Sequence, residues 1–523
     1  MLDNRHSLIA FSPYLVLTAG VLIVLGCGLL FPRRAPRLPI LLSLATLVAT
    51  GVATYVTANE TPRGPFGGLV ARDGFGDFFL MVFAGAGLLM TYPLLLSREI
   101  FGALSPNAAT TASSNGPADV PDLAALTLAI VLGAGVMAIA DDLLVAYLAL
   151  EFVSLLSYAL TALSPGSRRS SEAALKYAIY GGVASGCLLY GFSLLYGLSG
   201  GLSFAAARAA LLATSPLTAA TIFTLLFAGL GFKIAVVPFH MWAPDVYEGA
   251  PTPVAAFFSV VPKAAGFALA YRFLQGGGMG TAGATALVTA AGPASTIATV
   301  VGLVAALTMT LGNLAALGQR NIKRLLAYSS IGHAGTVFLA FAAGTPEALQ
   351  AIVVYTGIYL FMNLAAFLVV IFVIEDNLAS ANTTEAEAVD SFAGLGRRAP
   401  VLAFCLTVAL FSLTGLPPLG GFVAKYALFS AVLQRGLVAD GTSLFVGLAL
   451  VGVLNTVVSL YYYARIVKVM YFRPPANAAT FTRVSRTQWL LLALTTIPTI
   501  ALGLVPGPLT EWAARIAPLW SGR

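Results

Sequence analysis

Lysine side chains occur inside long apolar segments of this chain, where an ionisable group is costly. Four of the six lysines lie in segments apolar enough to be membrane helices: Lys176, Lys233, Lys263 and Lys425. A lysine at the centre of a bilayer costs about 2.5–3.5 kcal/mol on insertion scales, so four of them amount to roughly 10 kcal/mol or more. Residues of this kind mark ion pathways and proton relays. The pattern therefore predicts a membrane protein that translocates protons or other cations.

Glu151 is the acidic partner that we expect for Lys233. It stands ten positions into the apolar run 142–163, which places it about 14 Å along a helix that rises 1.5 Å per residue. That depth is near the middle of a hydrocarbon core roughly 30 Å thick. Burial disfavours a charged lysine and a nearby carboxylate favours it, so Glu151 would tune the proton affinity of Lys233. The alternative is a structural carboxylate that is hydrogen-bonded to a neighbouring helix.

Three further groups continue the predicted path. Lys263 follows Pro262 within its apolar run and is the natural next site for a proton that leaves Lys233. Lys425 would be the last intramembrane site before the far side. His333 lies inside another apolar run, and a neutral imidazole can pass a proton on because its pKa falls near physiological pH. The alternative for His333 is a structural histidine with satisfied hydrogen bonds.

Lys176 and the residues after the seventh span allow several interpretations. Lys176 lies near the start of its span, where it can reload the path from the cytoplasm, extend its ammonium to the interface, or pair with Glu172 at i, i+4. His240, Asp245 and Glu248 follow one another closely in the sequence. A proton funnel, a capping network and a docking surface all fit this second group, and the sequence does not separate them.

The composition excludes a soluble globular protein. Hydrophobic residues make up 59% of the chain and charged residues 9%, with a mean hydropathy of +0.90, whereas soluble domains hold about 25% charged residues. The net charge of +7 is dispersed over short loops, which favours membrane topology over nucleic-acid binding. Cys27, Cys187 and Cys405 lack the spacing of a disulfide framework, a zinc site or an iron–sulfur site. Any redox chemistry is therefore expected in another chain.

Fourteen stretches approach or exceed the roughly 20 apolar residues that a bilayer-spanning helix needs. They run approximately over 11–31, 37–57, 77–96, 123–140, 142–163, 172–199, 216–237, 252–274, 293–316, 321–342, 347–375, 400–434, 443–471 and 487–507. The first is too long for a signal sequence and lacks a basic leader, so we expect an uncleaved helix.

The loops between these spans predict the orientation of the chain. Fourteen lysines and arginines gather on one side and eight on the other, which places the first set in the cytoplasm and both termini outside it. The segment 103–121 is rich in Ala, Ser, Asn and Pro and is predicted to be a mobile cytoplasmic insertion. The acidic segment 375–398 is interpreted as a solvated loop, with docking to a neighbouring subunit as the alternative.

Prolines interrupt two spans that also carry lysines. Pro238 follows Lys233, and the pair Pro417 and Pro418 precedes Lys425. A proline frees the carbonyl four residues before it, here those of Ile234, Leu413 and Thr414. Broken helices in corresponding halves indicate a transport site built from inverted repeats, and freed backbone groups at membrane depth must line water or protein. We therefore expect an all-α polytopic membrane protein with a hydrated interior path.

Three runs of sequence resemble the antiporter-like membrane subunits of bacterial respiratory complex I. They are GFKIAVVPFHMWAPDVYEGAPTPV (231–254), QRNIKRLLAYSSIGHAG (319–335) and LTGLPPLGGFVAKY (413–426). The resemblance covers roughly residues 10–510. Within this family the chain looks most like the subunit N type, because subunit M would carry glutamate in place of Lys425 and subunit L would continue beyond fourteen spans.

The resemblance implies a division of the chain and roles for its ionisable residues. It implies three N-terminal helices in 1–100, a flexible cytoplasmic loop in 101–122, inverted five-helix repeats in 123–275 and 293–472, and a last helix with its tail in 487–523. It also pairs Glu151 with Lys233 and matches Lys263, His333, Lys425 and Lys176 to proton-translocating positions. Helices 7 and 12 would be discontinuous.

The resemblance further implies a function: proton translocation by one membrane subunit of an NADH-quinone oxidoreductase, a translocase driven by quinone reduction in other subunits. No cofactor is expected in this chain, while FMN, iron–sulfur clusters and quinone are expected in partner subunits of a complex in the bacterial cell (inner) membrane. One alternative is a subunit of a multi-subunit sodium/proton antiporter or a membrane-bound hydrogenase. The other is a non-pumping assembly subunit whose charges only hold helices together.

Overall fold

The computed structural model describes residues 4–30, 38–58, 65–95, 97, 120–164, 167–275, 293–379, 386–439, 443–475 and 484–516. Its helices are α1 (Asn4–Ala10), α2 (Ser12–Leu30), α3 (Leu38–Val56), α4 (Pro65–Gly68), α5 (Gly74–Leu95), α7 (Val120–Ile139), α8 (Leu143–Thr161), α9 (Arg168–Ser199), α10 (Phe204–Ala213), α11 (Pro216–Ile234), α12 (Trp242–Gly249), α13 (Thr252–Gln275), α15 (Pro293–Leu317), α16 (Ile322–Ala343), α17 (Pro346–Ala379), η2 (Val389–Phe392), α18 (Leu395–Arg398), α19 (Pro400–Thr414), α20 (Gly420–Gln434), η3 (Arg435–Ala439), α21 (Ser443–Phe472), α22 (Arg486–Leu504) and α23 (Gly507–Ile516). Among these residues there is no strand, and only three isolated bridges join loops.

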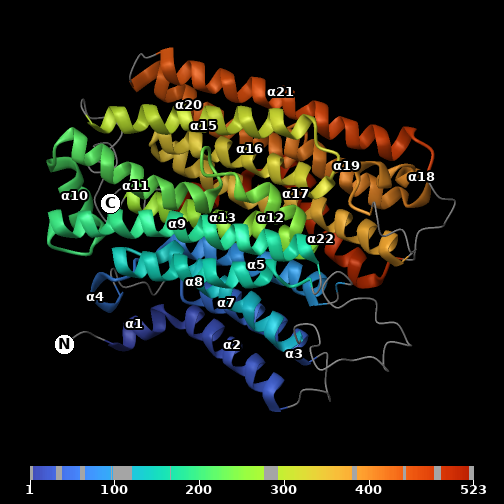
Figure 1. The fold of residues 1–523 in the computed structure, drawn as a ribbon, viewed down its shortest axis with the longest axis horizontal. Coiled ribbons are helices and arrows are strands. Elements are labelled where there is room, and N and C mark those ends of the chain that lie inside the picture. The colour runs from blue at the N-terminus through green and yellow to red at the C-terminus, as the bar shows by residue number, and fades with distance from the viewer. Residues whose placement is uncertain are drawn as a thin grey trace.

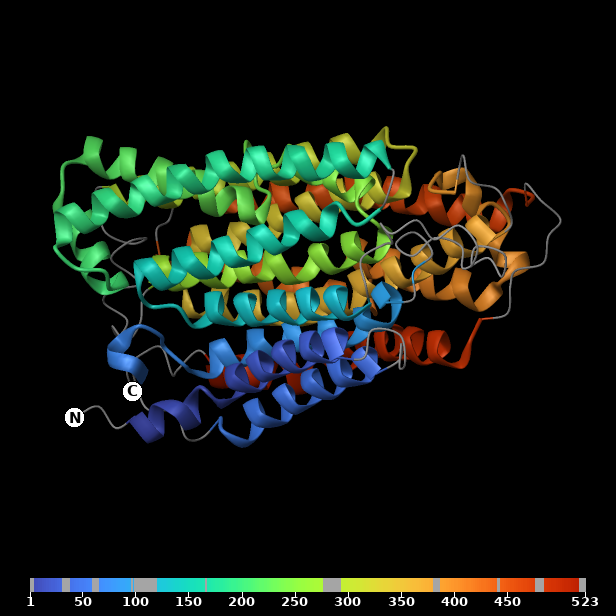
Figure 2. The ribbon, with the colours of Figure 1, turned by 60° about the horizontal axis from the view of Figure 1, so that its bottom comes forward.

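Long helices lie side by side along one direction of the molecule, with α10 near one end and α18 near the other (Figure 1). The first helices, α2 and α3, lie together on one face in both views (Figure 2). They pack on α5 and α7, which in turn contact the fully enclosed α13. This arrangement puts the remaining helices in a single bundle beside the N-terminal three, and it confirms an all-helical polytopic architecture.

Thirteen helices of the described residues are long and apolar enough to cross a membrane. They correspond to thirteen of the fourteen predicted spans. The remaining one, predicted over 400–434, consists of two halves of 15 residues each, α19 and α20. Neither half is long enough alone to reach the roughly 20 residues that a span needs. The structure therefore has one long spanning helix fewer than predicted, because the span predicted over 400–434 is broken at its prolines.

Both predicted helix breaks are present. α11 ends at Ile234, and Ala235 follows in a left-handed conformation with a φ of 64°. The chain then turns and continues as the short helix α12. α19 ends at Thr414, followed by Gly415 with a φ of 91°, before α20 begins at Gly420. A left-handed residue after the last turn is a common helix terminator, and the prolines downstream cannot donate the bonds that would continue either helix.

The centre of the bundle is formed by α13, α16 and α17. Their most apolar stretches are 100%, 94% and 89% buried within the chain. Such helices are enclosed by protein on every side, as expected when a helix is apolar all round. Lys263 and His333 lie on two of these three helices, so the predicted path runs through the most protected part of the molecule.

Several segments differ from the predicted boundaries. α7 begins at Val120, inside the expected loop 101–122, because Pro121 fits the first turn of a helix, where its missing N–H is not needed. The rest of the predicted insertion 103–121 lies outside the described residues. α10 and α23 are additional short helices in what the hydropathy marks as a loop and a tail.

The segment 375–398 is more ordered than a solvated loop in its described parts. α17 continues to Ala379, and η2 and α18 follow. Asp376 is 6% exposed and pairs with Arg398 at 3.3 Å. Glu387 of the same segment pairs with the distant Lys323 at 2.8 Å. Acidic side chains here therefore contact basic groups of the same chain. The sequence cannot show such a contact when the two residues are far apart in the chain.

Candidate functional site

Lys233 lies at the end of α11, one residue before the break, and is 1% exposed. Its Nζ donates to the Ser154 hydroxyl on α8 at 3.0 Å. Glu151 lies on the same face of α8, one turn before Ser154, and its Oε1 is buried without a hydrogen-bond partner. No ion pair joins Glu151 to Lys233 in the described part of the chain. The serine thus holds the ammonium next to the acid that the sequence predicts as its partner.

Lys263 lies in the middle of α13 and donates to the Ser330 hydroxyl on α16 at 2.6 Å. The same serine accepts a hydrogen bond from the Tyr359 hydroxyl on α17 at 3.0 Å. One turn after Lys263, Gly266 faces the stem of Lys233, where an added Cβ would be 3.2 Å from its Cγ. The structure therefore brings two predicted lysines together across α11 and α13.

His333 lies on α16 and is held by two tyrosines. Its Nδ1 is 2.5 Å from the Tyr355 hydroxyl of α17, and its Nε2 is 3.3 Å from the Tyr463 hydroxyl of α21. The Tyr463 hydroxyl also contacts Ser329. A neutral imidazole has one donor and one acceptor nitrogen, so hydroxyl groups on both sides can satisfy either tautomer. His333 is therefore placed to receive and release a proton.

Lys263 and His333 both line a small cavity of about 30 Å³. Its other polar lining groups are Ser259, Ser330, Tyr355, Thr356 and Tyr359. A space of this size holds a water molecule when polar partners are present. The step from Lys263 to His333 can therefore be bridged by hydroxyl groups and by water.

Lys425 lies one turn into α20 and donates to the Thr414 carbonyl at 2.8 Å. That carbonyl is one of those that the prolines were predicted to free. Thr456 of α21 is the second partner of Lys425, at 3.4 Å. Because Thr456 and Tyr463 are seven residues apart, they share one face of α21. This helix therefore links the surroundings of Lys425 to those of His333.

Among the described residues, no ion pair joins Lys233, Lys263 or Lys425 to a carboxylate. Two buried arginines do have carboxylate partners: Arg72 pairs with Asp77 at 2.9 Å, and Arg272 pairs with Asp73 at 2.6 Å. Arginine does not release its proton in proteins, whereas lysine does so readily when its surroundings demand it. The two paired arginines therefore carry fixed charges, whereas the three lysines could release their protons.

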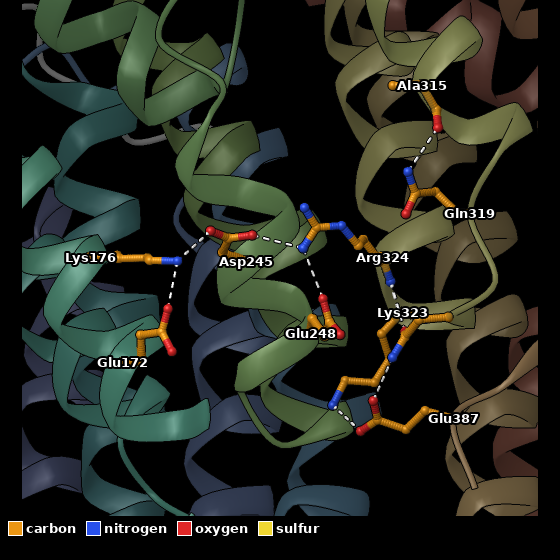
Figure 3. Close-up of polar contacts among 10 residues, drawn as sticks. Glu172, Lys176, Asp245, Glu248, Ala315, Gln319, Lys323, Arg324 and Glu387 are labelled. Carbon is orange, nitrogen blue, oxygen red and sulfur yellow. Dashed lines mark hydrogen bonds and ion pairs between the residues drawn. The ribbon is translucent and has the colours of Figure 1, made fainter. Parts of the chain in front are cut away.

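Lys176 lies apart from these three lysines, in a network of charges that Figure 3 shows. Its Nζ contacts Glu172 at 2.8 Å and Asp245 of α12 at 2.9 Å. Asp245 also accepts from Arg324 at the start of α16, at 2.7 Å, and Arg324 reaches Glu248 at 2.8 Å. The network joins α9, α12 and α16 at the end predicted to face the cytoplasm.

The charge of Asp245 is set by this network. Asp245 lies on α12, a short helix that is not one of the thirteen candidate membrane spans. Burial raises the pKa of Asp245, but hydrogen bonds from Lys176 and Arg324 outweigh it and hold this pKa below its ordinary value. Asp245 is consequently a carboxylate at neutral pH. It lines a cavity of about 260 Å³ together with Glu172, Lys176, Glu248 and Arg324, which is large enough for several water molecules.

A second ion pair lies beside this network. Lys323, the neighbour of Arg324, donates to Glu387 at 2.8 Å (Figure 3). It also donates to the Ala250 carbonyl at 2.8 Å. A wider cavity of about 1070 Å³ lies next to this pair and shares Arg169 and Glu248 with the smaller one. The ion pairs of Asp245 and Glu248 fit the network interpretation, and the two cavities beside them have room for the water that a proton funnel needs.

Sequence reasoning did not find the hydroxyl groups that hold the ionisable residues. Ser154, Ser330, Tyr355 and Tyr463 come from four different helices, and nothing in their local sequence marks them. Arg324 belongs to the fourteen basic residues that the sequence places on the cytoplasmic side, and nothing in the sequence links it to Asp245. No group of three or more His, Cys, Asp or Glu in the described ranges is arranged to hold a metal ion. The three cysteines are free thiols.

Comparison with known proteins identifies the family. Residues 140–452 match the family described as NADH:quinone oxidoreductase/Mrp antiporter, transmembrane. The chain is 40% identical to NADH-quinone oxidoreductase subunit N of Anaeromyxobacter sp. (strain Fw109-5), over 99% of this chain and 98% of that one. This similarity confirms the resemblance to the subunit N type.

Two solved structures have the same fold. A chain of respiratory complex I from Thermus thermophilus is 29% identical, with a TM-score of 0.75 over 96% of this chain and 99% of that one. A chain of the Mrp complex from Dietzia sp. DQ12-45-1b is 20% identical, with a TM-score of 0.78 over 99% and 98% of the two chains. The chain is an integral membrane protein that belongs to the NADH:quinone oxidoreductase/Mrp antiporter transmembrane family, with the subunits N of NADH-quinone oxidoreductase among its relatives.

Proposed function

We propose that this chain is a proton-translocating membrane subunit of an NADH-quinone oxidoreductase, coupled to quinone reduction in other subunits of the complex. The observation that carries the proposal is the row of Lys233, Lys263, His333 and Lys425 in the interior. Each is held by hydroxyl or carbonyl oxygens of neighbouring helices. Ionisable groups so arranged are typical of proton relays. The similarity to subunit N over nearly the whole chain supports the identity of the complex.

In the proposed cycle, a charge change in a neighbouring subunit alters the interaction between Glu151 and Lys233. Lys233 then releases its proton toward Lys263, and the proton continues through His333 to Lys425. Ser330 and the small cavity supply the oxygens between Lys263 and His333. Reprotonation from the cytoplasm proceeds through the cavity beside Lys176, which completes the cycle.

The surroundings of the subunit follow from the same proposal. FMN, iron–sulfur clusters and quinone would be held by partner subunits, with no cofactor in this chain, and the complex would lie in the bacterial cell membrane. Residues 123–275 and 293–472 would form the two inverted repeats, because each contains one broken span with a lysine beside its break. The three N-terminal helices and the last helix would flank them.

The experiment that tests the path compares variants of Lys233 in the whole complex, reconstituted in vesicles. Both Lys233→Ala and Lys233→Arg are expected to lower NADH-driven proton translocation by roughly 100-fold, within the range for loss of one proton-transfer group. Arginine keeps the charge but cannot release the proton. Glu151→Ala is expected to lower it as well. Lys468→Ala, at an exposed lysine outside the path, serves as the control.

Fully assembled Lys233→Ala and Glu151→Ala complexes that pump at the normal proton-to-electron ratio and rate would overturn the scheme. A purely structural role makes a different prediction. If these charges only hold helices together, the amount of assembled complex falls and the activity of each assembled complex stays normal.

The second candidate function is ion exchange in a multi-subunit sodium/proton antiporter, favoured by the similarity of fold to a chain of the Mrp complex. Gentle purification of the tagged chain from its own membranes separates the two. Co-purifying flavin- and iron–sulfur-bearing subunits would support the oxidoreductase. Antiporter-type membrane chains without a redox partner would support ion exchange.

A further inference from the structure

The two ring nitrogens of His333 face phenols that come from different helices. Nδ1 is 2.5 Å from the Tyr355 hydroxyl of α17, and Nε2 is 3.3 Å from the Tyr463 hydroxyl of α21. The Tyr463 hydroxyl also contacts the Ser329 hydroxyl of α16. Four side chains from three helices therefore form one chain of hydrogen bonds, which runs from Tyr355 through His333 and Tyr463 to Ser329.

The Tyr355 end of this chain lies on the side of Lys263. Tyr355 and His333 line the cavity of about 30 Å³ that Lys263 also lines, and a space of this size holds a water molecule when polar partners are present. The Tyr355 oxygen has a second hydroxyl neighbour, Thr336, so it can accept one hydrogen bond while it donates another. A proton that leaves Lys263 therefore meets Tyr355 and His333 within the same space.

The Tyr463 end of the chain leads away from this cavity. Tyr463 lies outside the cavity lining, on the helix whose Thr456 contacts Lys425 at 3.4 Å. Seven residues of helix, about 10 Å along the axis, lie between Tyr463 and Thr456. The hydrogen-bond chain therefore crosses His333 from the side of Lys263 and ends beside the helix that contacts Lys425.

The donors and acceptors of this chain can be satisfied in two directions. In one, the Tyr355 O–H donates to Nδ1, the Nε2–H donates to the Tyr463 oxygen, and the Tyr463 O–H donates to Ser329. In the other, every bond is reversed and His333 is in its second tautomer. Both arrangements hold the same number of protons and give each nitrogen of His333 a partner. Since buried polar groups need partners, the chain is satisfied both before and after a proton has crossed it.

We propose that Tyr355 and Tyr463 are relay residues, the entry and exit phenols of His333. A proton that leaves the Lys263 ammonium through water in the cavity adds to the Tyr355 oxygen, while the Tyr355 O–H proton moves to Nδ1. The Nε2–H proton moves to the Tyr463 oxygen, and the former Tyr463 O–H proton passes to Ser329, which releases its own proton to water. Each group gains one proton and loses one, so only one proton has moved. This inference rests on the proposed function, because His333 must carry protons for it to hold.

A purely structural role for the two phenols makes a different prediction. Tyr355 and Tyr463 are 1% and 0% exposed, so loss of either hydroxyl leaves one side of a buried histidine without its hydrogen bond. If the phenols only hold His333 in place, such a loss lowers the amount of assembled complex. A relay needs the hydroxyl itself, so its loss slows proton transfer in each assembled complex.

The test uses the whole complex in vesicles, with Tyr355→Phe, Tyr463→Phe, Tyr14→Phe and His333→Gln. Tyr14→Phe is the matched control, since Tyr14 of α2 is also fully buried and its hydroxyl has no hydrogen-bond partner in the described part of the chain. Glutamine at position 333 keeps one donor and one acceptor for the two phenols. The measurements are the amount of assembled complex, the rate of NADH-driven proton translocation per assembled complex, and the change of that rate in D₂O.

We expect Tyr355→Phe and Tyr463→Phe each to slow proton translocation per assembled complex by about tenfold or more. Both should show a larger D₂O effect, because proton transfer has become limiting. His333→Gln is expected to be slower by roughly 100-fold, because an amide does not relay protons. Tyr14→Phe should match the unmodified complex in all three measurements.

Tyr355→Phe and Tyr463→Phe complexes with the rate and D₂O effect of Tyr14→Phe would overturn the relay, whatever the amount of complex that assembles. A defect in only one of the two would limit the relay to that phenol and overturn the continuous chain. His333→Gln separates the two levels of the proposal. If His333→Gln pumps normally, the proposed path itself fails, whereas a defect in His333→Gln with normal phenylalanine variants removes only the phenols.

Discussion

At the residue scale, uncharged oxygens hold the lysine nitrogens of the proposed path. Lys233 and Lys263 each donate to a serine, and Lys425 donates to a backbone carbonyl. An oxygen without charge stabilises an ammonium less than a carboxylate does, because hydrogen bonds between two ionised groups are the strong ones. A lysine held by a neutral oxygen therefore needs less free energy to release its proton than one paired with a carboxylate.

The Ser330 hydroxyl accepts hydrogen bonds from two donors, Lys263 and Tyr359. Ser330→Ala is expected to slow proton translocation by about tenfold or more, because the hydrogen bond from a charged group is worth about 1.5–3 kcal/mol and each 1.36 kcal/mol is tenfold in rate. The rate is measured in vesicles with the reconstituted complex.

The control is Ser43→Ala in α3. Ser43 is equally buried, but its hydroxyl bonds only to the Pro39 carbonyl of its own helix. Equal rates for the two variants would show that Ser330 holds no part of the path.

At the scale of elements, the second helix break places a lysine beside a freed backbone carbonyl. Thr414 ends α19, and its carbonyl accepts from Lys425 across the break. In α11 the lysine comes before the break, and the Phe232 carbonyl accepts from the indole nitrogen of Trp242 at 2.9 Å. At each break, a carbonyl near the end of the helix accepts a hydrogen bond from a side chain. In a continuous helix such a carbonyl would be bonded to the next turn.

Gly415→Ala is expected to disturb the second break. Gly415 has a φ of 91°, and an added Cβ would be 2.9 Å from the Cδ of Lys425. A left-handed non-glycine residue costs about 1–2 kcal/mol, and the methyl group would displace the lysine stem. The variant should melt at a lower temperature and translocate protons more slowly.

Gly447→Ala on α21 is the matched control, since its Cβ meets nothing within 4 Å and its backbone is helical. Thermal unfolding of the purified complex and vesicle assays check both variants. An unchanged rate in Gly415→Ala would mean that the position of Lys425 does not depend on this turn.

At the scale of the whole molecule, buried ion pairs fasten the N-terminal helices to the rest of the chain. Arg272 of α13 is fully buried and donates to both oxygens of Asp73, which lies just before α5, at 2.9 and 2.6 Å. It also donates to the Ala138 carbonyl of α7 at 2.6 Å. One side chain therefore joins three elements from distant parts of the sequence.

Asp73→Asn is expected to destabilise the protein by about 3–5 kcal/mol, because it leaves a buried arginine without that counter-ion. Asp390→Asn is the control: Asp390 pairs with Arg473 at the surface, where the side chains are 74% and 55% exposed. Such a pair contributes at most about 1 kcal/mol.

Thermal unfolding and the yield of assembled complex measure the difference between these two variants. The proton-to-electron ratio of the Asp73→Asn complexes that do assemble should stay normal. A changed ratio would assign Asp73 to the path instead of to the scaffold.

The sequence by itself determined the membrane class, the spans to within a few residues, the two breaks and the positions of the ionisable residues. These features are local: the length of an apolar run sets a span, and proline ends a helix wherever it stands. Lys233, Lys263, His333 and Lys425 could be named as candidates because a charge within an apolar run is conspicuous without any structure.

Only the tertiary structure decided what surrounds those residues. An apolar run fixes the length of a helix but not its rotation about its own axis, which depends on contacts with helices far away in the sequence. The hydrogen bond from Lys233 to Ser154, one turn after Glu151 on α8, could not be read from the sequence for this reason. Arg324 joins Asp245 for the same reason, since residues 79 positions apart meet only when α12 and α16 pack together.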